Sequence, residues 1–134
     1  MGGPDVLGGP SVTLLELANT VERGLPKIAL ENVARHVFPR AADQRALMYR
    51  VVPEATFKRR GLYLSPAESE RTERMARVVA LAEEVWQEPV ETRRFLTTPH
   101  PELGGKTPLD AALSELGARQ AEVVMARILY GLPV

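Results

Sequence analysis

The sequence of 134 residues has no cysteine, only two histidines and no net charge. Without cysteine there is no disulfide, thiolate nucleophile or zinc-thiolate site, and two distant histidines offer little to a metal. No apolar run approaches the roughly 20 residues that cross a bilayer. The N-terminus also lacks a basic stretch followed by an apolar core. We therefore expect a cytoplasmic protein with no cofactor, metal or membrane partner, and with few of the parts that catalysis requires.

Charge is present in quantity but is unevenly distributed. Residues 1–34 carry a net charge of −2, residues 35–60 of +5 and residues 61–134 of −3. The central block holds seven basic and two acidic side chains. Such a block is typical of a local nucleic-acid contact surface, but an arginine-rich helical face in water gives the same pattern. Charge alone leaves both interpretations open.

Helix punctuation is clear along the chain. Thr13 with Glu16, and Ser65 with Glu68, match the Ser/Thr-x-x-Glu capping box that opens a helix. Proline favours the first helical position, and glycine favours the residue that follows a helix. The predicted starts are Thr13, Pro26, Ser65, Pro89 and Thr107, and the predicted ends are Gly24, Pro39, Gly117 and Gly131. Gly117 is therefore predicted to end the helix that begins at Thr107, and a last helix is predicted over residues 118–130.

Apolar residues recur at helical spacing, and no stretch alternates convincingly as a strand. The sequence therefore predicts an all-α fold, a helical bundle. The apolar faces that we expect to be buried are Leu14, Leu17, Ala18 and Val21; Ile28, Ala29, Val33 and Val37; Met75, Val78, Val79, Ala82, Val85 and Trp86; Val90, Phe95 and Leu96; Leu109, Ala112, Leu113 and Leu116; and Ala121, Val124, Met125 and Ile128.

Two short helical segments, 43–51 and 53–60, lie within the basic block with almost no linker between them. Pro53 forces the break because it cannot donate into the preceding helix but can start a new one. This spacing predicts a helix-turn-helix, whose second helix enters the major groove of DNA. Phe57 is expected to point inward, which leaves Ala55 and Arg59 outward, flanked by Thr56 and Lys58. The alternative is an ordinary helical corner whose arginines are only solvated.

A series of short motifs runs in order through the second half of the chain. They are Leu64-Ser65 with Glu68-Ser69, Phe95-Leu96, Leu103-Gly104-Gly105 with Thr107-Pro108-Leu109, and a last helix that ends at Gly131. In this order and spacing, residues 62–131 resemble the toxin-binding domain of the Xre/MbcA/ParS-type antitoxin family. Residues 52–60 look like the Xre-type helix-turn-helix of that family, in which Thr56, Arg59 and Arg60 match a threonine followed by arginines.

The resemblance implies a type II antitoxin and not an enzyme. Its partner would be a RES-domain toxin, an enzyme that degrades or uses NAD, whose active site the C-terminal domain would block. The N-terminal domain would bind operator DNA and repress the operon. The implied organisation is an N-terminal tail (1–10), an Xre-like helix-turn-helix region (11–61) and a toxin-binding domain (62–134). We also expect a homodimer, because helix-turn-helix proteins usually read paired half-sites. A helical interaction adaptor that does not bind DNA is the alternative function.

The toxin-binding surface is expected on the glycine loop, the last helix and the tail. Consecutive glycines allow close backbone approach, and arginine with aromatic residues anchors many interfaces. The expected contact residues are Leu103, Gly104, Gly105, Lys106, Arg127, Tyr130 and Leu132. The structural alternatives are a tight turn for the glycines and hydrophobic closure of the last helix for Tyr130 and Leu132.

Two enzymatic interpretations are set aside. Gly105-Lys106-Thr107 resembles the end of a phosphate-binding loop, but His100 stands where that motif requires glycine. His100 with Glu102 is a conceivable general base with its orienting carboxylate, but a loop rich in proline offers no dry pocket for it.

Overall fold

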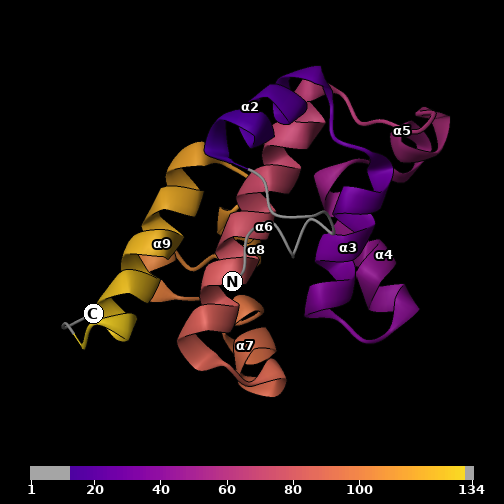
Figure 1. The fold of residues 1–134 in the computed structure, drawn as a ribbon. Helices are drawn as coiled ribbons and strands as arrows, with labels where there is room; N and C mark the ends of the chain where they lie inside the picture. The colour runs from indigo at the N-terminus through magenta and orange to yellow at the C-terminus, as the bar shows by residue number, and fades with distance from the viewer. Residues whose placement is uncertain (1–12, 132–134) are drawn as a thin grey trace. The chain divides into compact units, whose positions relative to one another are not determined.

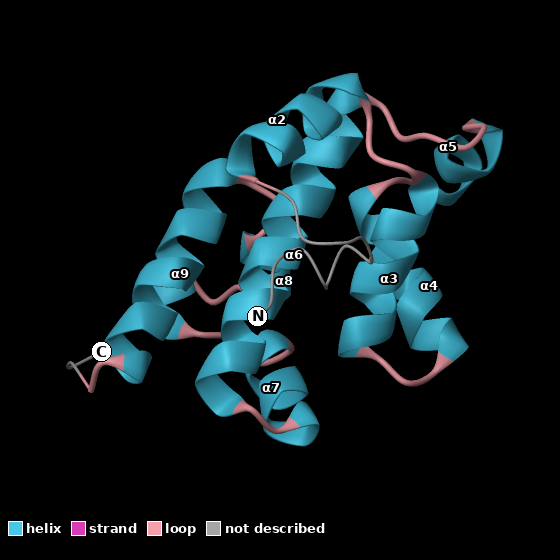
Figure 2. Ribbon diagram, viewed as in Figure 1, coloured by secondary structure: helices cyan, strands magenta, loops and turns pink. Residues whose placement is uncertain are grey.

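The computed structural model describes residues 13–131, and every regular element in that range is a helix (Figures 1 and 2). The all-α prediction is confirmed. The single β-type pairing within this range is an isolated bridge between Pro26 and Tyr63. The predicted N-terminal tail (1–10) lies outside the described residues.

The described chain forms two compact units, residues 13–73 and 74–131. Helix α6 begins in the first unit and ends in the second. The helices are α2 (Leu14–Arg23), α3 (Lys27–Val37), α4 (Ala41–Val51), α5 (Glu54–Arg59), α6 (Pro66–Trp86), α7 (Pro89–Leu96), the 3-10 helix η1 (Pro101–Leu103), α8 (Pro108–Ala111) and α9 (Glu115–Leu129). The sequence boundary at residue 61 for the toxin-binding domain stays a prediction.

The first unit is organised around α3 and α4, which lie side by side (Figure 1). Helix α2 opens with the predicted capping box between Thr13 and Glu16 and ends at Gly24. Phe38 caps α3 just before Pro39, as the sequence predicts. The buried apolar side chains of these elements are Val21, Leu25, Ala29, Leu30, Val33, Ala34, Val37, Leu47, Met48, Val51, Val52, Phe57 and Leu64.

The second unit contains the rest of α6 together with α7, η1, α8 and α9. Helix α7 begins at Pro89, the predicted start, and the Thr107 hydroxyl caps α8 by accepting from the Asp110 N–H at 3.1 Å. Trp86 stacks on Phe95 with ring centroids 4.3 Å apart, so the tryptophan anchors the α6–α7 corner. Buried alanines, valines and methionines of α6 and α9 supply most of the remaining interior.

The prediction that Gly117 ends a helix is wrong. Ser114 is the N-cap of α9, and its hydroxyl accepts from the Gly117 N–H at 3.1 Å, so Gly117 lies in the first turn of that helix. The glycine is required by space, because a Cβ at this position would lie 2.2 Å from the Ala111 carbonyl oxygen. The close approach between the first turn of α9 and the end of α8 therefore explains this glycine, and helix termination does not.

Six apolar side chains expected to be buried are exposed, namely Leu14, Ala18, Ile28, Val90, Leu116 and Ile128. Each occupies the expected helical register, but it lies on a part of its helix that nothing in the described chain covers. Periodicity identifies an apolar face, whereas burial depends on which element packs there.

Candidate nucleic-acid interface and partner surface

The break between α4 and α5 is the predicted one. Val52 and Pro53 both adopt extended backbone conformations, so the two helices are separated by only two residues. The Arg71 guanidinium donates from Nε to the Val51 carbonyl oxygen at 3.0 Å. This bond satisfies an otherwise orphaned carbonyl at the end of α4 and ties the turn to α6. The arrangement is that of a helix-turn-helix, with α5 as the second helix.

Phe57 fixes which face of α5 points inward. Its ring is buried and meets Tyr49 edge to face, with centroids 6.1 Å apart. The Lys27 ammonium lies 4.3 Å from the centre of the same ring, which is cation–π distance. Ala55 and Arg59 are consequently exposed, as the helical spacing predicts, with Lys58 exposed and Thr56 half-buried beside them.

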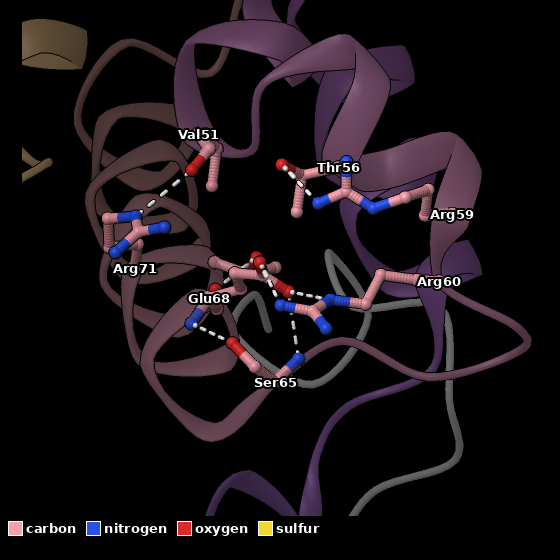
Figure 3. Close-up of polar contacts among 8 residues, drawn as sticks. Val51, Thr56, Arg59, Arg60, Ser65, Glu68 and Arg71 are labelled. Atoms are coloured by element: carbon pink, nitrogen blue, oxygen red, sulfur yellow. Dashed lines mark hydrogen bonds and ion pairs between the residues drawn. The ribbon is translucent and has the colours of Figure 1, made fainter.

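The exposed charges of α5 are partly paired within the helix. The Lys58 ammonium lies 2.8 Å from the Glu54 carboxylate, one turn earlier. This hydrogen bond raises the pKa of Lys58. Arg59 reaches only the Thr56 hydroxyl, at 3.5 Å, the limit of a hydrogen bond (Figure 3). Arg59 is therefore the α5 cation with most of its donor capacity directed to solvent.

Arg60 has a different environment. Its guanidinium donates from Nε and Nη2 to the two carboxylate oxygens of Glu68, at 3.0 and 2.9 Å (Figure 3). Glu68 is the acidic member of the predicted capping box of α6. Its Oε1 also accepts from the Ser65 N–H at 2.8 Å, while the Ser65 hydroxyl accepts from the Glu68 N–H at 3.2 Å.

The charge state of Glu68 follows from these donors. The Arg60 guanidinium and the Ser65 N–H lower the pKa of Glu68 from 4.5 to about 2, although burial acts in the opposite direction. The carboxylate is ionised throughout the physiological range, and the pair neutralises one of the positive charges of the basic block.

In the second unit, the glycine loop folds back on itself. The His100 carbonyl accepts from the N–H groups of Leu103 and Gly105, and the His100 N–H donates to the Lys106 carbonyl at 3.1 Å. Gly104 and Gly105 both have positive φ, 67° and 82°, a conformation that side chains disfavour in succession. The loop presents Gly104, Gly105 and Lys106 to solvent.

An ion pair connects this loop to α9. The Arg127 guanidinium lies 2.9 Å from the Glu102 carboxylate, so the structure brings the loop and the last helix together. Tyr130 follows at the end of α9 with 74% of its surface exposed. Leu103 is buried and supports the loop from inside, and Leu132 lies outside the described residues.

His100 has a structural role in the loop. Its Nδ1 accepts from the Glu102 N–H at 3.1 Å and caps η1. The Glu102 carboxylate is directed to Arg127 instead of the imidazole. The pairing of His100 with Glu102 is thus a backbone turn.

The part of the chain that the structure describes has neither a candidate metal site nor a candidate membrane-spanning helix. Between residues 13 and 131, no three histidine or acidic side chains are grouped closely enough to hold a metal ion. No helix in that part of the chain is long and apolar enough to cross a bilayer.

The fold thus defines a two-unit helical protein with a helix-turn-helix in the first unit. Residues 16–77 match the family model for the antitoxin Xre-like helix-turn-helix domain. Residues 81–131 match the model for the antitoxin Xre/MbcA/ParS C-terminal toxin-binding domain. No curated protein matches the chain.

The two matched ranges span most of the sequence, and the chain belongs to the Xre/MbcA/ParS antitoxin family. It is an antitoxin of a toxin–antitoxin system with a DNA-binding helix-turn-helix domain and a toxin-binding domain. Neither matched family is a family of enzymes.

Sequence reasoning missed three side chains that hold the helix-turn-helix together, Lys27, Glu68 and Arg71. No sequence motif identified Lys27 or Arg71, because each contacts an element distant along the chain. Glu68 was identified only as a helix cap, and Arg60 ends one helix whereas Glu68 lies in the next, so no helical periodicity relates the two residues.

Proposed function

We propose that this antitoxin neutralises a RES-domain, NAD-consuming toxin by covering its active site, and that it represses its own operon in the cytoplasm as a dimer. The match of residues 81–131 to a toxin-binding domain carries the first part of the proposal. The exposed loop from Gly104 to Lys106, joined to α9 by the Glu102–Arg127 ion pair, is the proposed contact surface. The antitoxin contributes surface and charge, and no chemistry of its own.

The contact surface combines a hydrogen-bonded backbone turn with exposed side chains. The loop is held by its own backbone hydrogen bonds, so little ordering entropy is lost when a partner docks there. Lys106 on the loop and Tyr130 at the end of α9 are both exposed to solvent, and they supply a cation and an aromatic ring. Such residues dominate binding energy when a partner buries them.

Co-expression with the adjacent toxin gene tests this proposal. The wild-type antitoxin is expected to restore growth and cellular NAD and to co-purify with the toxin. Tyr130→Ala is expected to weaken the complex by about 2 kcal/mol, as a buried aromatic anchor would. Binding is measured by titration calorimetry with purified toxin.

The matched control is Tyr63→Ala, which removes a tyrosine that is 59% exposed in the first unit. It is expected to bind toxin like the wild type. Equal losses from both variants would remove α9 from the proposed surface. Absence of any NAD-consuming partner encoded beside the gene would contradict the RES assignment.

The DNA-binding part of the proposal depends on α5. Replacing Lys58 and Arg59 together with alanine is expected to weaken binding to the duplex upstream of the operon. The slope of log affinity against log salt concentration should become shallower by roughly two. Each protein cation that binds a phosphate releases about one counterion, and the variant has two such cations fewer. Fluorescence anisotropy over a salt series measures this slope, and the saturation point should show two chains per duplex.

Replacing Arg93 and Arg94 of α7 removes the same charge from the second unit and is the control. It should leave the salt dependence unchanged. If the wild-type chain itself shows no salt-sensitive binding to its upstream DNA, the protein acts as an adaptor without DNA binding.

A further inference from the structure

Helix α5 cannot hold its own position. It has six residues, and its N-cap, Pro53, makes no side-chain hydrogen bond to the helix. Isolated helices shorter than about 12 residues are marginal in water. The orientation of α5 is therefore set by contacts with other elements, and Phe57 is the one buried anchor within it.

The C-terminal end of α5 is held at two points. Arg60, its C-cap, is bound through its side chain to Glu68 at the start of α6. The Arg60 carbonyl oxygen accepts from the Lys27 ammonium at 3.3 Å, and the same ammonium lies over the Phe57 ring. One residue thus joins α5 to α3 and to α6.

The Arg60–Glu68 contact has the geometry of an orienting pair. Two parallel hydrogen bonds from a planar guanidinium to a carboxylate fix both distance and angle. The Glu68 side chain is 6% exposed and that of Arg60 is 40% exposed. Glu68 is itself held by Ser65, so the carboxylate that receives Arg60 belongs to a rigid helix start.

We infer that Arg60 and Glu68 are positioning residues, which orient α5 for sequence-specific DNA recognition without contacting DNA themselves. This inference rests on the proposed role of α5 in DNA binding. Two of the guanidinium nitrogens of Arg60 already bind a carboxylate in the protein, so they are not available to a guanine edge. The base-reading role remains with Arg59 and its exposed neighbours.

The test is Glu68→Gln. A purely electrostatic role of Glu68 and a positioning role predict opposite changes in the affinity for DNA. If only charge mattered, removing a carboxylate near a polyanion would strengthen DNA binding. If Glu68 positions α5, binding to the upstream duplex should weaken. Binding to a scrambled duplex of equal length should not weaken, because phosphate attraction is intact. The expected fall in the ratio of the two affinities is about tenfold, comparable to one bidentate base contact.

Arg60→Lys is the companion variant. It preserves the charge and leaves the Ser65–Glu68 capping box intact, but it cannot form the paired hydrogen bonds. The ratio should fall as it does in Glu68→Gln, and the double variant should be no worse than either single one. In contrast, Arg60→Gln should leave the salt slope unchanged. A fall of about one charge in that slope would place Arg60 on a phosphate and overturn the inference, as would unchanged or tighter specific binding by Glu68→Gln.

Hydrogen exchange separates this inference from the proposed function. If the wild-type chain binds both duplexes equally, the proposed autoregulation fails. The positioning role is then decided without DNA, by amide exchange in the full chain. Faster exchange over residues 54–59 in Arg60→Lys, with α3 unchanged, supports the positioning role. Unchanged exchange over residues 54–59 overturns it.

Discussion

Gly117→Ala is expected to destabilise the second unit by about 2 kcal/mol or more, although alanine is the better helix former by about 1 kcal/mol. The added Cβ would lie 2.2 Å from the Ala111 carbonyl oxygen and 2.8 Å from the Ser114 hydroxyl oxygen. The serine can rotate away, but the Ala111 carbonyl belongs to the backbone that ends α8. Relief of the clash therefore requires α9 to move relative to α8.

Trp86 reports on this change because it belongs to the second unit and stacks on Phe95. Urea unfolding followed by Trp86 fluorescence should show a lower midpoint for Gly117→Ala than for the wild type. Circular dichroism at 222 nm should follow the same transition. The control is Gly61→Ala, whose Cβ would meet no atom within 4 Å, and its stability should change by less than about 0.5 kcal/mol. A midpoint for Gly117→Ala at or above that of the wild type would mean that helix propensity outweighs the clash.

Helix starts could be predicted from the sequence because capping is a local interaction. Thr13 with Glu16, Ser65 with Glu68, and Thr107 with Asp110 all make the bonds that their spacing indicates. Each involves residues three apart, so no knowledge of the fold is required. The break at Pro53 was predictable for the same reason, since proline restricts its own backbone and that of the residue before it.

The same rules failed where distant elements meet. Gly117 follows the local pattern of a helix end, but the space it needs is set by the path of the chain at Ala111. Leu14 and Leu116 have the spacing of an apolar face, but no described element covers them. Sequence periodicity therefore indicated the type of each element more reliably than the environment of each side chain.

In the candidate sites, too, local contacts could be predicted from the sequence and contacts between distant residues could not. The outward face of α5 followed from the helical repeat and from Phe57, and the structure places Ala55 and Arg59 as predicted. The pairing of Arg60 with Glu68 depends on how α5 is folded against α6, and no spacing rule contains it. In the second unit, the Glu102–Arg127 pair likewise joins residues 25 apart in the chain.

Stability of the first unit is expected to fall as pH decreases from about 4.5 to about 2, with Glu68 as a major cause. The pKa of Glu68 in the folded chain is about 2, against an ordinary value of 4.5. A carboxyl group whose pKa is lowered on folding contributes its full stabilisation above the higher value and none below the lower one. The shift corresponds to a contribution on the order of 3 kcal/mol at neutral pH.

Glu68→Gln should therefore be markedly less stable than the wild type at pH 7 and nearly as stable at pH 2, because protonated glutamate and glutamine are similar in shape and charge. Urea unfolding by circular dichroism at several pH values measures the difference, and hydrogen exchange over residues 25–64 assigns it to the first unit. Glu70→Gln changes an exposed carboxylate on the same helix and is the matched control, with a small difference at every pH. If the gap between Glu68→Gln and the wild type stayed constant from pH 7 to pH 2, the ionised carboxylate would not be what holds Arg60 and the end of α5. A gap that closes between pH 4.5 and pH 2 would tie that contact to the charge of Glu68.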